Sequence, residues 1–382
     1  MSTKTLIFTA ILAFAQLAQA TNYTWDVSSG NWSAPGSWTP SGPPTGADTA
    51  TFGNNNESAN PTTVNNTVDS GFTGTISNLT YGDFEPSGSY VYPVTFIPAN
   101  NTLFVTNTLV VGGQSQSSGN YATFAYVVGG GTLNVSAPNV FIGNGGSGSG
   151  ACAFFDLSGL TNFIYNNANG FIGISTNGGP LASFTRFGGS MTLACGSNNI
   201  TAAALNLGTS TSAQGGAGLL VSGVFGGGVQ NNDGPVPGGN PEVLTFGPGT
   251  NVINAQVINI ADQKYGFIVT NSGSGGVRIR GITGADSDGN VNITLGDRNV
   301  NGGSGQTTGW LMLNGCAVDI KANTLIVGER ISGEPNSSGD AGNGLLQFDT
   351  GTISANSLLM ADNNGSDNGS ALAQANGEIQ VG

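Results

Sequence analysis

The chain contains no histidine, and this limits the chemistry that it can perform. Ser-His-Asp and Cys-His catalysis, histidine general bases and histidine-ligated metals are all excluded. Proton transfer would have to come from the 21 Asp and Glu residues, with eight Lys and Arg to handle charge. Clustered carboxylates, sometimes with calcium, are what polysaccharide-cleaving enzymes need.

One stretch, from position 278 to position 298, concentrates charged residues. Within it, the segment Asp286-Ser287-Asp288-Gly289-Asn290 begins like a calcium-binding loop. Such a loop has glycine at its sixth position and glutamate at its twelfth, whereas Val291 and Asp297 stand here. The residues from Val291 onward also have the pattern of a strand, which would carry Asp297 away from the turn. A calcium or catalytic site is one interpretation, and a solvated turn between strands is the favoured one.

The remaining charged residues offer less. Arg278 and Arg280 lie two apart in a strand-like run, so both would point from one face, the outer one. Asp233, Asp319 and Asp349 are isolated in sequence, and only stacking of repeats would bring the last two together. No residue is therefore assigned as catalytic, cofactor-binding or metal-ligating. No cofactor is expected, and the chain is expected not to be an enzyme.

A phrase of alternating aliphatic residues, usually followed by glycine, recurs along the chain and must set the framework for any site. Its copies end at Val111, Ile142, Ile172, Leu207, Ile260, Leu295, Val327 and Met360. The steps between these positions are 31, 30, 35, 53, 35, 32 and 33 residues. A nearly fixed period of this size predicts a solenoid, in which each repeat buries its apolar face against its neighbours.

The repeat at 309–341 predicts how one coil is built. Three short strands, at 310–313, 317–320 and 324–327, are separated by two tight turns and followed by a long polar segment. This predicts an all-β, right-handed parallel β-helix of about eight coils with three short strands per coil. A sandwich or a propeller is the competing fold, but a propeller blade needs four strands.

The variable segment follows the third strand in every repeat, so all such segments would leave along one edge of the rod. The 53-residue step contains the largest of them, near 224–241. We interpret it either as a recognition loop or as a degenerate extra coil.

Residues 1–20 have the pattern of a secretory signal peptide. Lys4 is followed by an apolar stretch at 6–17 and by the cleavage-site residues Ala18-Gln19-Ala20. The apolar stretch is too short for a typical membrane span, and nothing later is longer. The mature chain from Thr21 is therefore expected to be exported, to the extracellular space or the outer cell surface, with no membrane span of its own.

The mature chain is acidic. Without Lys4 it has seven basic and 21 acidic residues, a net charge of 7 − 21 = −14. This argues against nucleic acid as a partner. Its 64 glycines and its 38% hydrophobic residues favour a folded chain with many tight turns over a disordered one.

Three tryptophans, Trp25, Trp32 and Trp38, fall within 14 residues near the mature N-terminus. A solenoid needs an atypical end that covers its first coil, and large aromatic residues suit such a cap. Aromatic faces also stack on sugar rings, which is the alternative. The expected organisation is a signal peptide at 1–20, a cap with irregular strands at 21–100, and a repeat β-helix at 101–382 whose last coil is incomplete.

The same region resembles a known class of proteins. The runs Tyr23-Thr24-Trp25-Asp26, Gly30-Asn31-Trp32-Ser33 and Ser37-Trp38, with Pro43-Pro44 and 48–53, are similar to the mature start of bacterial exported proteins with autotransporter-associated β-strand repeats. The resemblance covers about 30 residues, and the repeats match in style only. It implies a β-helical passenger, secreted or exposed at the surface, and carries over no catalytic residue. Members often end in a β-barrel or a sorting tail, and neither is present here, so we expect an N-terminal fragment of a longer protein.

Cys152, Cys195 and Cys316 are an odd set for an oxidising compartment. Each lies beside apolar, strand-like residues, so we expect three buried, reduced thiols. One disulfide between neighbouring coils is the alternative.

Two functional hypotheses follow. The first is a non-enzymatic, secreted or cell-surface β-helical passenger that acts in adhesion, in a surface layer or in extracellular matrix. Its partner would be an extracellular glycan or a cell-surface molecule, with self-association through an open C-terminal coil. The second is a carbohydrate-active β-helix enzyme, a polysaccharide lyase or glycoside hydrolase. An enzyme needs two or more carboxylates within roughly 5 to 10 Å in one groove.

Overall fold

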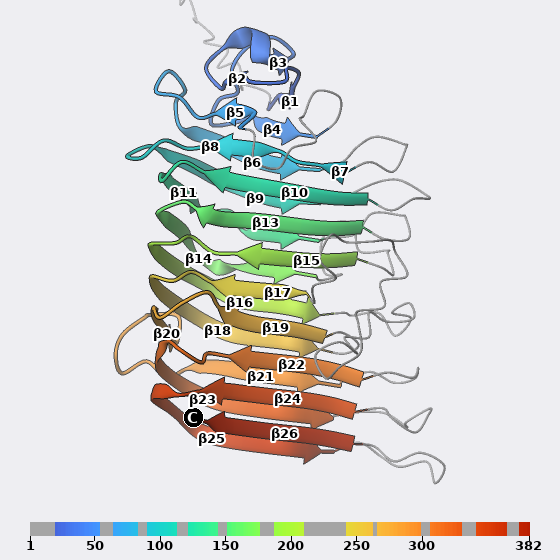
Figure 1. Ribbon diagram of the computed structural model, residues 1–382, viewed down its shortest axis with the longest axis vertical. Helices are drawn as coiled ribbons and strands as arrows, with labels where there is room; N and C mark the ends of the chain where they lie inside the picture. The colour runs from blue at the N-terminus through green and yellow to red at the C-terminus, as the bar shows by residue number, and fades with distance from the viewer. Residues whose placement is uncertain are drawn as a thin grey trace, which may run out of the picture.

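The computed structural model describes residues 20–53, 64–82, 90–112, 121–143, 151–175, 187–209, 242–262, 266–298, 306–330, 341–364 and 374–382. These residues form an all-β parallel β-solenoid of about seven turns, which confirms the predicted fold class. Its strands stack one above another along a rod (Figure 1). Among the described strands, only the pair β1–β3 at the N-terminal end is antiparallel.

The strands belong to two sheets. Sheet A has 14 strands: β1 (Asn22–Trp25), β3 (Trp38–Thr39), β4 (Thr49–Phe52), β6 (Thr75–Tyr81), β9 (Thr102–Val111), β11 (Thr132–Val135), β12 (Asn139–Ile142), β14 (Asn162–Ile174), β16 (Ser197–Thr209), β18 (Thr250–Asp262), β20 (Gly276–Arg280), β21 (Val291–Asp297), β23 (Ala317–Arg330) and β25 (Thr350–Asn363).

Sheet B has 12 strands: β2 (Gly30–Asn31), β5 (Asn66–Thr67), β7 (Tyr90–Val91), β8 (Val94–Phe96), β10 (Tyr121–Val128), β13 (Ala151–Gly159), β15 (Phe187–Thr192), β17 (Val243–Phe246), β19 (Gly266–Asn271), β22 (Gln306–Met312), β24 (Ala341–Phe348) and β26 (Gln374–Val381). One short 3-10 helix, η1 (Pro35–Ser37), lies near the N-terminal end.

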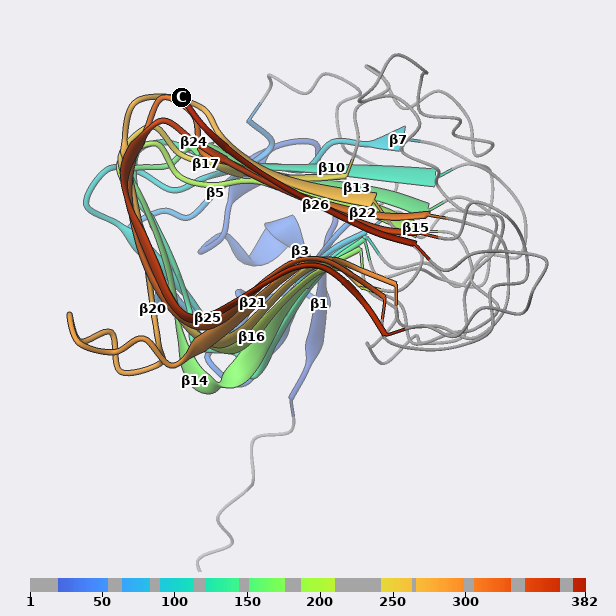
Figure 2. The ribbon, with the colours of Figure 1, turned by 90° about the horizontal axis from the view of Figure 1, so that it is seen from below.

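In most coils the second and third predicted strands are one continuous strand of sheet A. β23 runs through Lys321–Asn323, where the sequence predicted a turn. The register skips Asn323, because Ala322 pairs with Val291 and Thr324 pairs with Asn292. One extra residue of this kind is a bulge, and it bends the strand without ending it. Each coil therefore has three sides when viewed along the rod (Figure 2).

Columns of aliphatic residues fill the space between the sheets. The column that ends the recurring phrase is Val111, Ile142, Ile174, Leu207, Ile260, Leu295, Val327 and Met360. Its third member is Ile174, two residues beyond the predicted Ile172, because Ile142 pairs with Ile174 and Ile174 with Leu207. With this correction the third copy no longer deviates, and only the 53-residue step is long.

The N-terminal tryptophans form the predicted cap. Trp25, Trp32 and Trp38 are all buried, and Trp38 contacts both of the others edge to face. The indole of Trp32 donates to Oδ1 of Asn66 at 2.8 Å, and that of Trp38 donates to the carbonyl of Trp32 at 2.9 Å. Buried ring faces cannot stack on a sugar, so the alternative interpretation is wrong for these three residues.

Two cysteines can be placed. Cys316 is buried and free, as predicted, whereas Cys195 is free but exposed. Cys195 lies at the corner after β15, outside any strand, and its thiol donates to the carbonyl of Leu160 at 3.0 Å. The side chain of Cys152, the signal peptide and the excursion at 224–241 lie outside the described residues. In the part of the chain that is described, no helix has the length and apolarity needed to cross a membrane.

Candidate functional site: an acidic ladder at one edge

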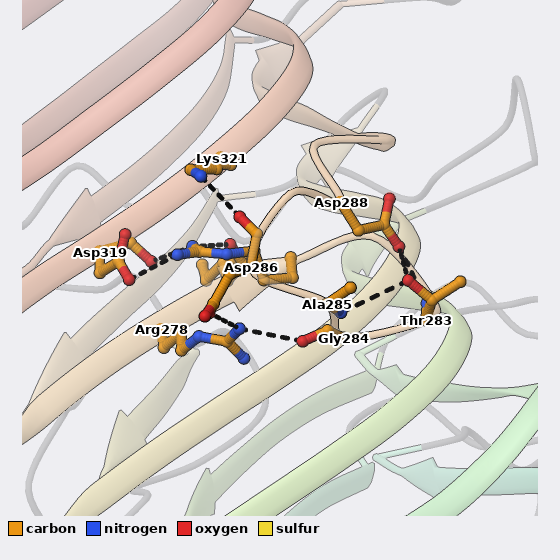
Figure 3. Close-up of polar contacts among 10 residues, drawn as sticks. Arg278, Thr283, Gly284, Ala285, Asp286, Asp288, Asp319 and Lys321 are labelled. Carbon is orange, nitrogen blue, oxygen red and sulfur yellow. Dashed lines mark hydrogen bonds and ion pairs between the residues drawn. The ribbon is translucent and has the colours of Figure 1, made fainter.

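The charge-rich stretch predicted from the sequence comprises the end of β20, a loop at 281–290 and β21. The loop protrudes from the rod (Figure 2), and Figure 3 shows its contacts. Arg278 donates to Oδ1 of Asp286 at 2.7 Å and to the carbonyl of Gly284 at 2.9 Å. Lys321, from the next coil, donates to the carbonyl of Asp286 at 2.5 Å. The hydrogen bond and the charge of Arg278 lower the pKa of Asp286. These contacts tie the loop to the outer surface of sheet A.

Asp288 stabilises the loop from within. Its carboxylate accepts from the backbone and hydroxyl of Thr283, at 3.0 and 2.5 Å, and from the backbone of Asn290 at 3.1 Å. The bond from the Thr283 hydroxyl is the main reason that the pKa of Asp288 is lowered, although burial opposes it. Asp286 and Asp288 thus have separate partners, and Asp297 lies at the far end of β21. Among the described residues, no group of three acidic or cysteine side chains could hold a metal ion.

Arg280 differs from its neighbour Arg278. Both alternate along β20 with the inward Val277 and Ile279, as predicted, but the side chain of Arg280 is only 2% exposed. It donates to the carbonyl of Asp319 at 2.8 Å and to the carboxylate of Asp319 at 2.5 Å. The strand register pairs Asp319 with Thr352, while Asp349 accepts from the backbone of Gly315. The suggested pairing of Asp319 with Asp349 does not occur.

A second group of charged residues lies where the variable segments begin. In each coil, the residue after the phrase has a left-handed backbone conformation, with φ between 52° and 78°. These residues are Gly112, Gly143, Ser175, Gly208, Ala261, Gly296, Gly328 and Ala361. Each turns the end of its sheet A strand toward the edge from which the next segment departs. This position explains the glycine in the phrase, because glycine adopts this conformation without steric cost.

The two sheets approach each other closely at the same level. Gly309, Gly344 and Gly377 form a column on sheet B. A Cβ atom at Gly344 would lie 2.6 Å from the carbonyl oxygen of Leu295 and would also strike the amide of Gly328. Gly309 lies against Gly296 in the same way. We call this contact of backbone with backbone the pinch.

Beyond the pinch, four carboxylates stand in register on adjacent strands of sheet A. Asp262 of β18 pairs with Asp297 of β21, Asp297 pairs with Glu329 of β23, and Glu329 pairs with Asp362 of β25. We call these four residues the acidic ladder. Adjacent parallel strands lie about 4.8 Å apart, so each carboxylate is a direct neighbour of the next.

Burial makes the acidic ladder unusual. Asp297 and Glu329 are each only 6% exposed, and Asp262 is partly buried. Burial raises the pKa of Asp297 to about 8, and the charges of Asp262 and Glu329 act in the same direction. Burial also raises the pKa of Asp262 to about 6, and burial with Asp362 and Asp262 raises the pKa of Glu329. These carboxyls therefore hold protons at pH values where ordinary ones do not.

Hydrogen bonding does little to offset this burial. Within the described residues, Oδ1 of Asp297 and Oδ1 of Asp262 are buried and have no hydrogen-bond partner. Two fully ionised carboxylates at this spacing would repel by about 3 kcal/mol at an effective dielectric constant of about 20. Protonation removes this repulsion and also lowers the cost of burying each oxygen.

One more buried carboxyl lies at the same edge. Glu242 takes the place in sheet B that Gly189 has one strand earlier and Phe267 one strand later. Burial raises its pKa to about 8, and the nearby Ser175 hydroxyl offsets only part of this. That hydroxyl is already engaged, because it accepts from the amide of Gly189 at 2.6 Å and donates to its carbonyl at 3.1 Å.

The acidic ladder was not predicted, although its signal is present in the sequence. The phrase is followed by Ala261-Asp262, Gly296-Asp297, Gly328-Glu329 and Ala361-Asp362. Extending the alignment of the repeats by two residues would have shown an acid at the same position in four successive copies. Asp297 was considered only as the end of a calcium loop, to which it does not belong.

Comparisons with known proteins found no relative that could explain this site. No protein-family model, no curated protein and no solved structure matches the chain. The fold is therefore established by the strand pairing alone, and a β-solenoid is compatible with several kinds of function.

Proposed function

We propose that the chain is a non-enzymatic β-helical passenger, exported to the cell surface or the extracellular space, that presents its variable segments to a binding partner. One observation carries this proposal. From β4 onward, every described sheet A strand that precedes a variable segment ends at one edge, and the following sheet B strand begins there. The strand ends on both sides of these segments gather at that edge in the view along the rod (Figure 2).

The framework suits presentation. Coils that hydrogen-bond to both neighbours hold the segment ends at fixed spacing, about 4.8 Å per coil. At the bend within sheet A, side-chain amides stack along the outside, as Asn323 donates to Asn292 at 3.1 Å and Asn356 to Asn323 at 3.4 Å. The proposed partner is an extracellular glycan or a cell-surface molecule.

A binding experiment tests this function. The mature chain would be applied to a glycan array and to whole bacterial and host cells, beside variants in which segment 331–340 or 210–241 is replaced by Gly-Ser of equal length. Loss of binding in a segment variant, with the same thermal unfolding, supports presentation. A matched control substitutes Asn323 and Asn356 on the outer face by serine, and it should bind normally. Binding that survives replacement of every variable segment would refute the proposal.

The acidic ladder favours a second candidate, a carbohydrate-active enzyme. Retaining glycosidases hold two carboxyls about 5 to 5.5 Å apart, which is close to the strand spacing of the ladder. A raised pKa also suits a general acid. Against this, Asp297 and Glu329 are almost fully buried, whereas a sugar chain needs an open groove. Release of reducing ends from a polysaccharide panel, abolished in Glu329→Gln, would select the enzyme over the passenger.

Two further parts of the proposal concern assembly and origin. The last coil exposes Leu358, Leu359, Met360 and Val381, and the outer edges of β25 and β26 have no partner strand among the described residues. We propose that copies self-associate through this end, which light scattering would detect as concentration-dependent mass.

The similarity of 23–53 to exported proteins with autotransporter-associated repeats supports export and a surface location.

A further inference from the structure

The acidic ladder sits at the one place in each coil where the two sheets part and the variable segment begins. Its members follow the left-handed residues directly, so each is the last or nearly the last residue of its strand. The last backbone hydrogen bonds of these strands lie next to the ladder residues in the chain. The amide of Arg298 donates to the carbonyl of Glu329 at 2.9 Å, and the amide of Asn364 donates to that of Arg330 at 2.8 Å.

The charged groups around the ladder are few. Arg298 and Arg330 follow Asp297 and Glu329 in their strands and are fully buried. Across the pinch, the described residues of β19, β22 and β24 include no titratable side chain. Glu378 is the acid of β26, and it pairs with Leu345 on the outward face. The charges that raise the pKa of Asp297 and Glu329 are those of other ladder carboxyls.

A buried oxygen at the centre of the ladder has no partner. Asp297 is only 6% exposed, and its buried Oδ1 receives no hydrogen bond from the described residues. An ionised carboxylate in this position would face Asp262 on one side and Glu329 on the other. A protonated carboxyl, by contrast, can donate to a neighbouring carboxyl oxygen. This arrangement therefore favours protonated carboxyls over ionised ones.

We propose that the acidic ladder is a proton-operated latch, in which protonated Asp262, Asp297 and Glu329 hold the ends of β18, β21 and β23 together and ionisation of these three carboxyls lets the strand ends fray. Fraying would start at the residues beyond the pinch, where only one or two backbone hydrogen bonds per strand must break. This inference goes beyond the proposed function and holds whatever the segments bind.

The direction of the pH effect follows from linkage. A carboxyl whose pKa is raised by folding binds its proton more tightly in the folded chain than in the unfolded one. It costs no stability below the unfolded pKa near 4, and its cost grows as the pH rises toward the folded pKa. For Asp297 the loss of stability is complete near the folded pKa of about 8, and for Asp262 it is complete near the folded pKa of about 6. Stability should therefore fall from about pH 4 to about pH 8.

Hydrogen exchange measured by mass spectrometry tests the latch on the full chain. Protection of peptides covering 291–298 and 323–330, corrected for the intrinsic rate, should drop at least about tenfold from pH 5 to pH 9. In the double variant Asp297→Asn, Glu329→Gln, the uncharged amides cannot ionise, and protection should stay constant. Asp286→Asn, on the outer surface, is the matched control and should behave like the unchanged chain. Should the double variant not fold, Asp297→Asn alone should lose most of the pH dependence.

Two results would overturn the proposal. The first is protection that does not change with pH in the unchanged chain, or that changes equally in the double variant. The second is recovery of full protection at pH 9 on addition of millimolar calcium, which would show that a cation and not a proton occupies the ladder. Glycan or cell binding is not used as a readout, so failure of the latch and failure of the proposed function are distinguishable.

Discussion

At the scale of single residues, the pinch sets the strictest requirement in the molecule. Gly344 has no positive φ, yet a methyl group there would strike three backbone atoms of the opposite sheet, which belong to Leu295, Val327 and Gly328. We expect Gly344→Ala to destabilise the chain by about 1–3 kcal/mol, the usual cost of overpacking, because backbone atoms cannot move aside as a side chain would. Urea unfolding followed by circular dichroism would measure this.

The control for this prediction is another strand glycine, Gly276. The nearest atom to a Cβ added there is the carbonyl oxygen of Ala317 at 3.9 Å, an ordinary contact, and its φ is not positive. Gly276→Ala should leave stability unchanged or raise it slightly. Equal destabilisation by both substitutions would mean that the close approach at the pinch is not what makes Gly344 necessary.

For the residues with a left-handed backbone conformation, we expect glycine to stabilise the chain in place of alanine. Ala261 has a φ of 55°, a conformation that costs an L-residue roughly 1–2 kcal/mol. Ala261→Gly removes this strain, and the greater flexibility of glycine returns about 0.5–1 kcal/mol of that gain. The substitution should therefore stabilise the chain slightly, although glycine normally weakens a strand. Chemical denaturation of the variant would check it, and a clear loss of stability would show that the alanine methyl group contributes packing that outweighs the strain.

At the scale of elements, the cap protects the first coils. Trp32 is fully buried, contacts Trp38, Phe52 and Phe72, and donates its indole hydrogen to Asn66. Replacing it with alanine should cost about 3–5 kcal/mol, as for other large aromatic residues in cores. Because coils depend on their neighbours, unfolding should begin at this end, and exchange protection of 75–81 should fall before that of 317–330.

The same element allows a check by fluorescence. Trp25, Trp32 and Trp38 are buried, so added oligosaccharides should not change their emission. Trp38→Phe is a milder companion variant, since it keeps an aromatic ring but loses the hydrogen bond to the carbonyl of Trp32 and part of the ring contacts. Uniform loss of protection along the whole rod in Trp32→Ala would contradict a local role for the cap.

The elements also show what could be predicted from the sequence. The repeat period predicted the solenoid, because apolar columns require the same residue types at the same place in each coil. The bend at Asn323 was interpreted as a turn, since a bulge and a turn use the same polar residues and differ only in whether pairing continues. The exposure of Cys195 depends on its place at a corner, which neighbouring apolar residues do not reveal.

The acidic ladder could have been predicted in part. Its four acids follow the phrase at a constant offset, so the correct alignment of the repeats places them in one column. Their burial could not be predicted in the same way, because it depends on the closeness of the two sheets at the pinch. That closeness comes from glycines on sheet B, more than ten residues away along the chain from the acids that they help to enclose.

At the scale of the whole molecule, a solenoid should tolerate the loss of one complete turn. Each coil pairs only with the coils before and after it, so stability is approximately a sum of repeats and their interfaces. Deleting 329–361 joins Gly328 directly to Asp362, which occupies the position of Glu329 in the next coil. β23 then becomes the last long strand, β26 lies beside β22, and the ion pair of Arg280 with Asp319 is kept.

The shortened chain should fold with an unchanged far-ultraviolet spectrum per residue and a melting temperature within about 5 °C of the parent. The matched control deletes 345–361, about half a turn, and joins sheet B directly to the end of a sheet A strand. This breaks the stacking of inward columns, so the end of the rod should become sensitive to protease. If the full-turn deletion unfolds as readily as the half-turn deletion, the coils are not interchangeable units and the C-terminal turn has a specific role in holding the rod together.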